Sequence, residues 1–91
     1  MTPEQRPAAI REKLVSAFAP TVIEITDDSH KHAGHASAGG AGHFTVRLVS
    51  SAFNGKNTIE RHRMVYAALA DLMPEHIHAL SIQASAPAEQ A

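Results

Sequence analysis

The spacing of apolar residues near the N-terminus predicts an amphipathic helix. Ile10, Leu14 and Phe18 recur every four residues with charged residues between them, which is typical of one buried stripe on a helix. We expect this helix to begin near Ala8 and to end before Pro20, because proline cannot continue a helix. The stripe predicts a helix that packs on a sheet.

Strict alternation then predicts two strands, Thr21 to Asp27 and His43 to Ser50, which we expect to pair antiparallel. The segment between them, about residues 28–42, holds four of the five glycines and, together with His43, four of the seven histidines. A connection of this length is uncommon unless it is functional or disordered. We therefore expect a flexible loop that a rigid scaffold presents.

Helical spacing returns in the second half of the chain. Residues 51–56 predict a short helical turn, and Asn57 supplies an N-cap with Glu60 three residues later. The longest predicted helix runs over about 57–72, with an apolar face formed by Ile59, Val65, Leu69 and Leu72.

A third alternating segment, Ile77 to Ser85, predicts a strand with His78, Leu80 and Ile82 on one face. Because a helix precedes it, we expect it to lie parallel to the second strand. The order predicts an α+β fold in a single domain over 1–91: α-β-β-α-α-β, with helices covering a three-stranded mixed sheet. We expect an ordered core over about 8–85 and a frayed tail over 86–91.

Composition narrows the function. The 91 residues carry a formal net charge of −1, which gives no long-range field for a polyanion. Cysteine is absent, so disulfides, thiol catalysis and cysteine-ligated zinc are excluded within the sequence given. The sequence contains no apolar run of membrane-spanning length and no secretory signal, so we expect a cytoplasmic protein without membrane attachment.

Histidines are the strongest candidates for chemistry, because neutral imidazole binds metal ions at physiological pH. His32 and His35 lie three residues apart in the predicted loop, and the fold could bring His78 toward them. Two imidazoles leave coordination positions for water or a partner molecule. A stand-alone zinc or nickel site is one interpretation, and histidines with purely structural roles are another.

Catalysis by the chain itself is a weak interpretation. Asp27, Ser29 and either His30 or His32 have the residue types of a nucleophilic triad, but a triad is held rigidly by the fold and is not strung along a glycine-rich loop. Asp27 and Asp28 are better explained by strand termination and turn formation. We expect no enzymatic activity.

Nucleic-acid binding is a further candidate function. Lys56, Arg61 and Arg63 gather at the start of the long predicted helix, just after a glycine turn, where a phosphate group could bind. The string from Gly39 to Gly42 matches the GxxG of KH modules, but there that loop joins two helices, whereas here it joins two strands. A solvated face or a patch for an acidic partner also explains these cations.

Taken together, several blocks of the sequence resemble the BolA family in order and spacing over roughly residues 10–87. They are Asp27 to His35, His43-Phe44, Val49 to Lys56, Arg61 to Tyr66, and Ile77 to Leu80. The resemblance implies a fold related to the type II KH domain, in agreement with the predicted order of elements.

The resemblance also implies a partner. BolA-like proteins form a heterodimer with a monothiol glutaredoxin that bridges a [2Fe-2S] cluster, with one thiolate from the glutaredoxin and one from glutathione. The family's pattern places one ligand on His78 and another in the loop, on His32 or His35. Two imidazoles on one iron resemble Rieske-type ligation, which raises the reduction potential. We expect a monomer without the partner, acting in iron–sulfur cluster assembly, trafficking or iron regulation.

Some bacterial members of the family are described as DNA-binding transcription regulators. For this chain, that role would use the turn and the basic start of the long helix, with Lys56, Arg61 and Arg63. DNA binding is therefore the alternative function that the resemblance implies.

Overall fold

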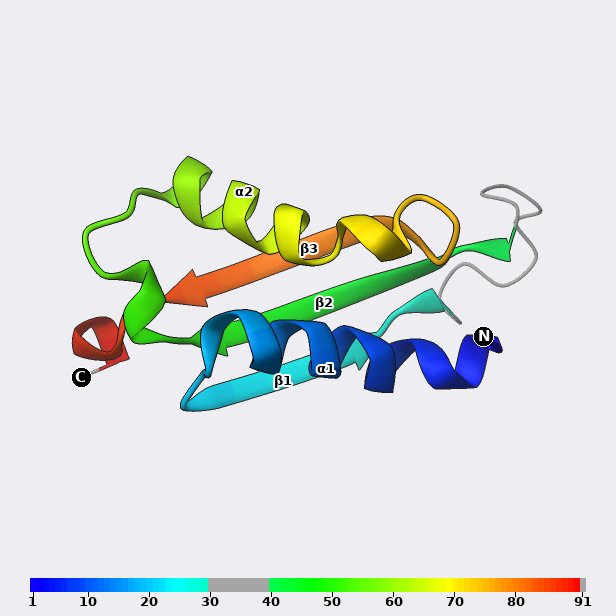
Figure 1. The fold of residues 1–91 in the computed structure, drawn as a ribbon, viewed down its shortest axis with the longest axis horizontal. Helices are drawn as coiled ribbons and strands as arrows, with labels where there is room; N and C mark the ends of the chain where they lie inside the picture. Colours follow the sequence, from blue (N-terminus) through cyan, green and yellow to red (C-terminus); the bar gives the residue numbers. More distant parts are fainter. Residues whose placement is uncertain (30–39, 91) are drawn as a thin grey trace.

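The computed structural model describes residues 1–29 and 40–90, in which two helices pack on one face of a three-stranded sheet (Figure 1). The predicted α+β fold and its order of elements are confirmed. The elements, with 3-10 turns written η, are η1 (Pro3–Gln5), α1 (Arg6–Phe18), β1 (Val22–Asp27), β2 (Gly42–Val49), η4 (Ser51–Phe53), α2 (Thr58–Ala68), η5 (Ala70–Leu72), β3 (Ile77–Ser85) and η6 (Pro87–Gln90).

The sheet is mixed, as predicted, and its strand order is β1-β2-β3. β1 pairs antiparallel with β2, with Val22 opposite Val49 and Asp27 opposite Phe44. β3 pairs parallel with β2 on the other side. The first two strands are joined through residues 28–41, so the ends of this connection lie at the same end of the sheet as the start of β3 (Figure 1).

α1 begins two residues earlier than expected. Pro7 lies in its first turn, where a backbone N–H has no partner within the helix, so the missing donor carries little cost. The helix ends at Phe18 and is capped by Ala19, which has left-handed backbone angles, φ 43° and ψ 54°, and whose N–H donates to the carbonyl of Val15 at 3.0 Å. Pro20 follows, as the sequence predicts.

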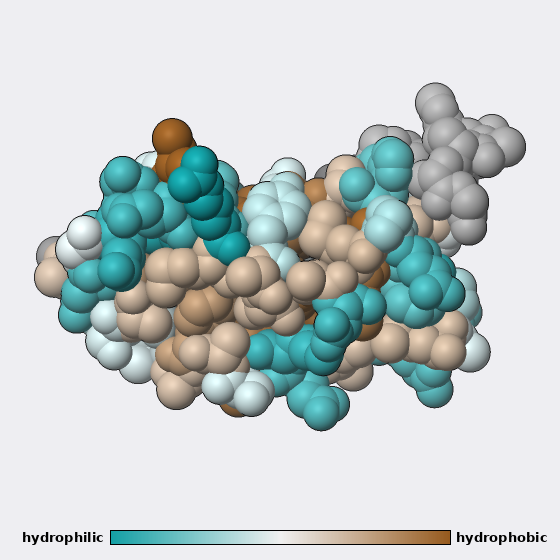
Figure 2. Space-filling model, turned by 45° about the horizontal axis from the view of Figure 1, so that its top comes forward, coloured by the Kyte–Doolittle hydropathy of each residue, from teal (hydrophilic) through white to brown (hydrophobic). Residues whose placement is uncertain are grey.

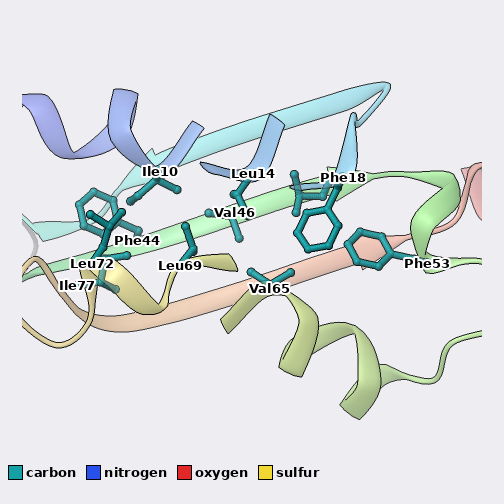
Figure 3. Close-up of a cluster of buried hydrophobic side chains, with 11 residues drawn as sticks. Ile10, Leu14, Phe18, Phe44, Val46, Phe53, Val65, Leu69, Leu72 and Ile77 are labelled. Carbon is teal, nitrogen blue, oxygen red and sulfur yellow. The ribbon is translucent and has the colours of Figure 1, made fainter. Parts of the chain in front are cut away.

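The core lies between the helices and the sheet (Figure 3). Ile10, Leu14 and Phe18 are buried, so the predicted stripe of α1 is confirmed. The rings of Phe18 and Phe53 lie 5.0 Å apart between centroids and close one end of the core. The other buried core residues come mainly from β2, α2 and η5 and include Phe44, Val46, Leu48, Val65, Leu69, Leu72 and Ile77.

The long helix predicted over 57–72 is shorter than expected. α2 ends at Ala68, and the N–H of Leu69 is shared between the carbonyls of Val65 and Tyr66, which tightens the chain into η5. This tightening keeps both Leu69 and Leu72 buried. Ile59 is 63% exposed, so its predicted place on the buried face is wrong.

The sheet face opposite the helices, here called the uncovered face, is polar. It comprises Glu24, Thr26, Thr45, Arg47, Ser81 and Gln83, which alternate with the core-facing positions. Arg47 Nη1 and Glu24 Oε1 lie 3.3 Å apart across neighbouring strands. Within the described residues, no helix is long and apolar enough to cross a membrane.

Candidate metal-binding site

An irregularity at the start of β3 sets the position of His78. Gly42 pairs with Ile77 but the next residue, His43, pairs with Ala79, so His78 is the extra residue of a β-bulge. Simple alternation placed His78 on the same face as Leu80 and Ile82, and that prediction is wrong. Ile77, Leu80 and Ile82 pack with the core, whereas the His78 side chain is exposed.

The bulge brings His78 against His43. Their imidazole rings lie 5.2 Å apart between centroids, with an angle of 50° between the ring planes. His43 is half-buried and follows the first residue of β2, whereas its neighbour Phe44 points into the core. Two imidazoles therefore meet at the end of the uncovered face, one from each of two adjacent strands.

The backbone around His43 is tightly held. Its N–H donates to Ser29 Oγ at 3.1 Å, and its carbonyl accepts from the N–H of Asp28 at 2.8 Å. Gly42 fits here because it lacks a side chain: a Cβ at this position would lie 2.6 Å from Phe44 Cε2 and 2.7 Å from Ser29 Oγ. The close approach of β2 to residues 28–29 thus depends on glycine.

Asp27 and Asp28 have the structural roles expected of them. The N–H of Ser29 donates to Asp27 Oδ1 at 2.8 Å, which shapes the turn after β1. Asp28 Oδ2 accepts from the hydroxyl of Thr45 at 2.6 Å, across to β2. These contacts direct the chain out of the sheet beside the histidine pair.

The loop ligands predicted from the sequence, His32 and His35, lie outside the described residues, as does His30. The described residues on either side of them, Ser29 and Gly40, are anchored to the fold: Gly40 accepts from Arg6 Nη1 at 2.8 Å. Within the described ranges, no group of three or more histidine, cysteine or acidic residues could hold a metal ion. A site at His78 therefore needs further ligands from the loop or from another molecule.

The two remaining histidines lie elsewhere. His62 is half-buried on α2. The carbonyl of His76 accepts from the Gly42 N–H at 3.0 Å, and its Nδ1 is buried without a hydrogen-bond partner among the described residues. The sequence favours a structural or supporting role for His43, and the structure brings its ring against that of His78. Its contact with His78 depends on the β-bulge between β2 and β3, which the alternation of residue types along the sequence does not reveal.

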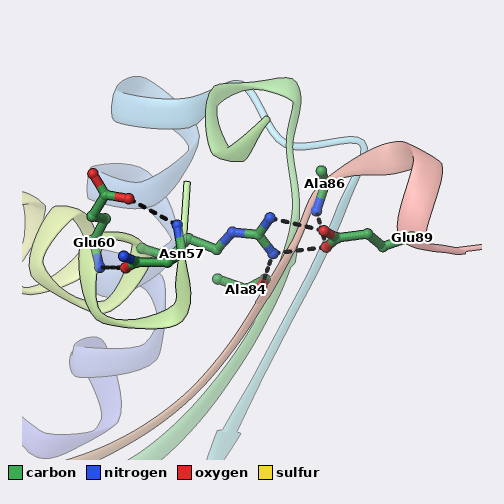
Figure 4. Close-up of polar contacts among 6 residues, drawn as sticks. Asn57, Glu60, Ala84, Ala86 and Glu89 are labelled. Carbon is green, nitrogen blue, oxygen red and sulfur yellow. Dashed lines mark hydrogen bonds and ion pairs between the residues drawn. The ribbon is translucent and has the colours of Figure 1, made fainter. Parts of the chain in front are cut away.

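The three predicted nucleic-acid-binding cations do not have equivalent environments. The Arg61 side chain is only 12% exposed and is engaged on two sides. Its Nη1 donates to the carbonyl of Ala84 at 3.0 Å and to Glu89 Oε1 at 2.7 Å, and its Nη2 donates to Glu89 Oε2 at 2.9 Å (Figure 4). Lys56 and Arg63 are exposed.

Glu89 also revises the predicted tail. Residues 86–91 were expected to fray, but Pro87–Gln90 form η6, and Ala86 N–H donates to Glu89 Oε1 at 2.9 Å. The hydrogen bonds from Arg61, followed by the one from Ala86, lower the pKa of Glu89 to about 2. Glu89 in turn raises the pKa of Arg61. The sequence alone predicts a frayed tail, because nothing in this short polar segment indicates the contact between Glu89 and Arg61.

The predicted start of α2 is confirmed in detail. The N–H of Glu60 donates to Asn57 Oδ1 at 2.8 Å, and the N–H of Asn57 donates to Glu60 Oε1 at 2.9 Å, which completes a capping box (Figure 4). Figure 2 shows hydrophilic side chains over the beginning of α2, with a small hydrophobic protrusion among them.

Comparison with known proteins places this fold in a family. The family model described as "BolA-like protein" matches residues 14–89. The human BolA-like protein 1 is 46% identical over 82 residues, which is 90% of this chain and 58% of that protein. The Escherichia coli protein named "DNA-binding transcriptional regulator BolA" is 42% identical over 73 residues, covering 80% of this chain and 68% of its own length.

Among solved structures, the BolA domain of SufE1 from Arabidopsis thaliana superposes with a TM-score of 0.82 at 46% identity, covering 92% of this chain and 94% of that one. The chain spans 58% of the length of the human relative, less than two thirds, so the match concerns this domain. The sequence matches and the structural superposition both cover most of the chain. The protein therefore belongs to the BolA-like family.

Proposed function

We propose that this protein partners a monothiol glutaredoxin and that the two proteins, with glutathione, hold a bridging [2Fe-2S] cluster to which His78 is a ligand. The work of the complex would be iron–sulfur cluster assembly, trafficking or iron regulation. We infer a cytoplasmic setting and a monomer in the absence of the partner.

The bulge at the start of β3 is the observation that carries the proposal. It takes His78 out of the core-facing alternation and exposes its imidazole at one end of the sheet. Bulges are common beside functional sites, because they re-aim a single side chain. A histidine needed only for packing would have no reason to depart from the alternation of its strand.

The donor set of this chain fits a shared cluster. The chain has no cysteine, so any thiolates at the iron must come from the glutaredoxin and from glutathione, while this protein contributes imidazoles. When bound, the cluster supplies redox-active iron, and imidazole ligation would raise its reduction potential relative to an all-thiolate cluster. The resemblance assigns the second imidazole to His32 or His35, in the loop that follows Ser29, whose hydroxyl oxygen accepts from the His43 N–H.

We further propose that α2 and β3 supply the docking surface for the glutaredoxin. Ile59 and Tyr66 are large apolar residues of α2 that are 63% and 40% exposed. They lie seven residues apart, which places them on one side of the helix, with the exposed cation Arg63 between them. An apolar stripe that includes a cation suits a partner surface that is itself partly apolar and acidic.

The test is reconstitution of the complex. The wild-type protein is mixed with a monothiol glutaredoxin, glutathione, iron and sulfide, and visible absorption and circular dichroism are recorded. We expect the spectrum of the glutaredoxin cluster to change to a new one that His78→Ala abolishes. Glu12→Ala is the control, because Glu12 is exposed on α1 and belongs neither to the histidine site nor to the proposed docking surface on α2 and β3.

Two results would contradict the proposal. One is a wild-type mixture whose spectrum is the sum of the separate proteins. The other is a new spectrum that survives His78→Ala unchanged. Thermal unfolding of each variant shows whether a lost signal reflects a lost ligand or a lost fold.

A second candidate function is DNA binding, favoured by the similarity to the Escherichia coli relative that is named a DNA-binding transcriptional regulator. The exposed cations Lys56 and Arg63 flank the start of α2, where backbone N–H groups also favour phosphate. Two observations count against DNA binding. Arg61 is paired with Glu89 and is therefore less available to a phosphate group, and the formal net charge of the chain is −1. Cluster binding through His78 and DNA binding through α2 can be separated by variants at each place.

A further inference from the structure

The geometry points to His43, rather than a loop histidine, as the second imidazole that binds the same metal centre as His78. This inference rests on the proposed function, because it identifies the second ligand of that site. It concerns two residues that the structure describes, one in β2 and one at the bulge of β3.

The separation of the two rings fits a shared ion. Two imidazoles bound to one tetrahedral centre, with metal–nitrogen distances of about 2.0–2.1 Å, have ring centres roughly 5 Å apart. The rings of His43 and His78 lie 5.2 Å apart and are tilted by 50°, so they are not stacked face to face. Small rotations about the side-chain bonds could direct one nitrogen of each ring to a common point.

His43 is also held more firmly than a loop residue can be. Its N–H and carbonyl are both fixed by hydrogen bonds, to Ser29 Oγ and from the Asp28 N–H, and Gly42 before it packs against the Phe44 ring. Ligands on strands are placed with less loss of conformational entropy than ligands on loops. The pair is therefore assembled by the sheet itself, before any metal or partner arrives.

The first experiment uses the full chain alone with Zn²⁺ as the probe. The three loop histidines are removed together (His30→Asn, His32→Asn, His35→Asn), and the ring protons of the remaining histidines are followed by NMR as zinc is added. We expect the His43 and His78 signals to change together, with one shared midpoint. The ring of His62, on α2, serves as the internal reference.

Single variants in the same background test the pairing. We expect His43→Asn to weaken zinc binding at His78 by about tenfold or more, since loss of even an outer partner of a metal ligand costs about 10–100-fold. His62→Asn should leave the zinc affinity unchanged. Separate midpoints for His43 and His78, or unchanged zinc binding at His78 in His43→Asn, would overturn the inference.

The reconstituted complex separates this inference from the proposed function. If the wild-type mixture forms no new cluster, the proposed function fails, whatever zinc does. If the cluster forms and its spectrum and reduction potential are unchanged in His43→Asn but are lost in His32→Asn or His35→Asn, the proposed function stands and this inference fails. We expect the opposite pattern, with the spectrum altered by His43→Asn and retained in the triple loop variant.

Discussion

Arg61 and Glu89 are joined by two parallel hydrogen bonds, of 2.7 Å and 2.9 Å, across 28 positions of the sequence. The same guanidinium donates to the carbonyl of Ala84 at the end of β3. One side chain of α2 thus holds the last turn of the chain against the edge strand.

The first prediction concerns stability in acid. The pKa of Glu89 is lowered from 4.5 to about 2, so its ionised form stabilises the fold above pH 4.5, and this contribution is lost as the pH falls from 4.5 to about 2. We expect Glu89→Gln to be less stable than wild type near neutral pH and to lose less stability across this window. Denaturant unfolding at several pH values measures both. Glu75→Gln changes an exposed carboxylate that has no ion pair among the described residues, and it should follow wild type.

The second prediction separates Arg61 from Arg63. Arg61→Ala removes the contacts to Ala84 and Glu89, so we expect a lower thermal midpoint, whereas Arg63→Ala removes an exposed cation and should leave the midpoint close to wild type. If the protein binds DNA, Arg63→Ala should weaken binding and reduce its salt dependence without unfolding the protein. Equal midpoints for the two variants would show that the Arg61 contacts contribute little.

The third prediction concerns Gly42. Gly42→Ala would place a methyl group 2.6 Å from the Phe44 ring, which is buried and cannot move freely. We expect the free energy of unfolding to fall by about 1–3 kcal/mol, as for other overpacked sites. Ser81→Ala, at an exposed position of β3, is the control and should change stability little. A stable Gly42→Ala protein would mean that β2 can shift away from residues 28–29.

The fourth prediction is that a glycine substitution stabilises the protein at position 19 and destabilises it at position 17. Ala19 has φ 43°, a left-handed conformation that costs residues with a side chain roughly 1–2 kcal/mol. Ala19→Gly should therefore stabilise the protein by about 0.5–1 kcal/mol, even after the larger entropy of the unfolded glycine chain. Ala17→Gly, inside α1, should destabilise it by about 0.8–1 kcal/mol. Thermal unfolding of the pair gives both signs in one experiment.

The elements of this fold are predictable because local signals agree with one another. Ile10, Leu14 and Phe18 repeat at helical spacing and are all buried. Asn57 and Glu60 form the capping box that marks the start of α2. Alternation around Val46 likewise predicts the central strand. Each of these signals is carried by residues close together in the sequence.

The site was only partly predictable, because its decisive feature is a local exception to a repeating pattern. Alternation along β3 placed His78 beside Leu80, and the residue types of the segment do not reveal a bulge. The role of Glu89 depends on Arg61, far away in the chain. The sequence singles out His78 at the start of the third strand, and the family resemblance implies that it is a ligand, but its contact with His43 depends on the register between β2 and β3.

The central position of β2 has a consequence for how the protein folds. β2 is the strand that pairs on both sides, and both pairings require long connections to close, through residues 28–41 and 50–76. Neither pairing is a tight hairpin, so the entropy of loop closure delays the sheet, whereas the first turns of α1 and α2 can form locally. We expect helix formation to precede strand pairing, with the amide protons of β2 acquiring protection last in pulsed hydrogen exchange. Early protection of β2, before the helices, would show that the sheet and not the helices organises the folding chain.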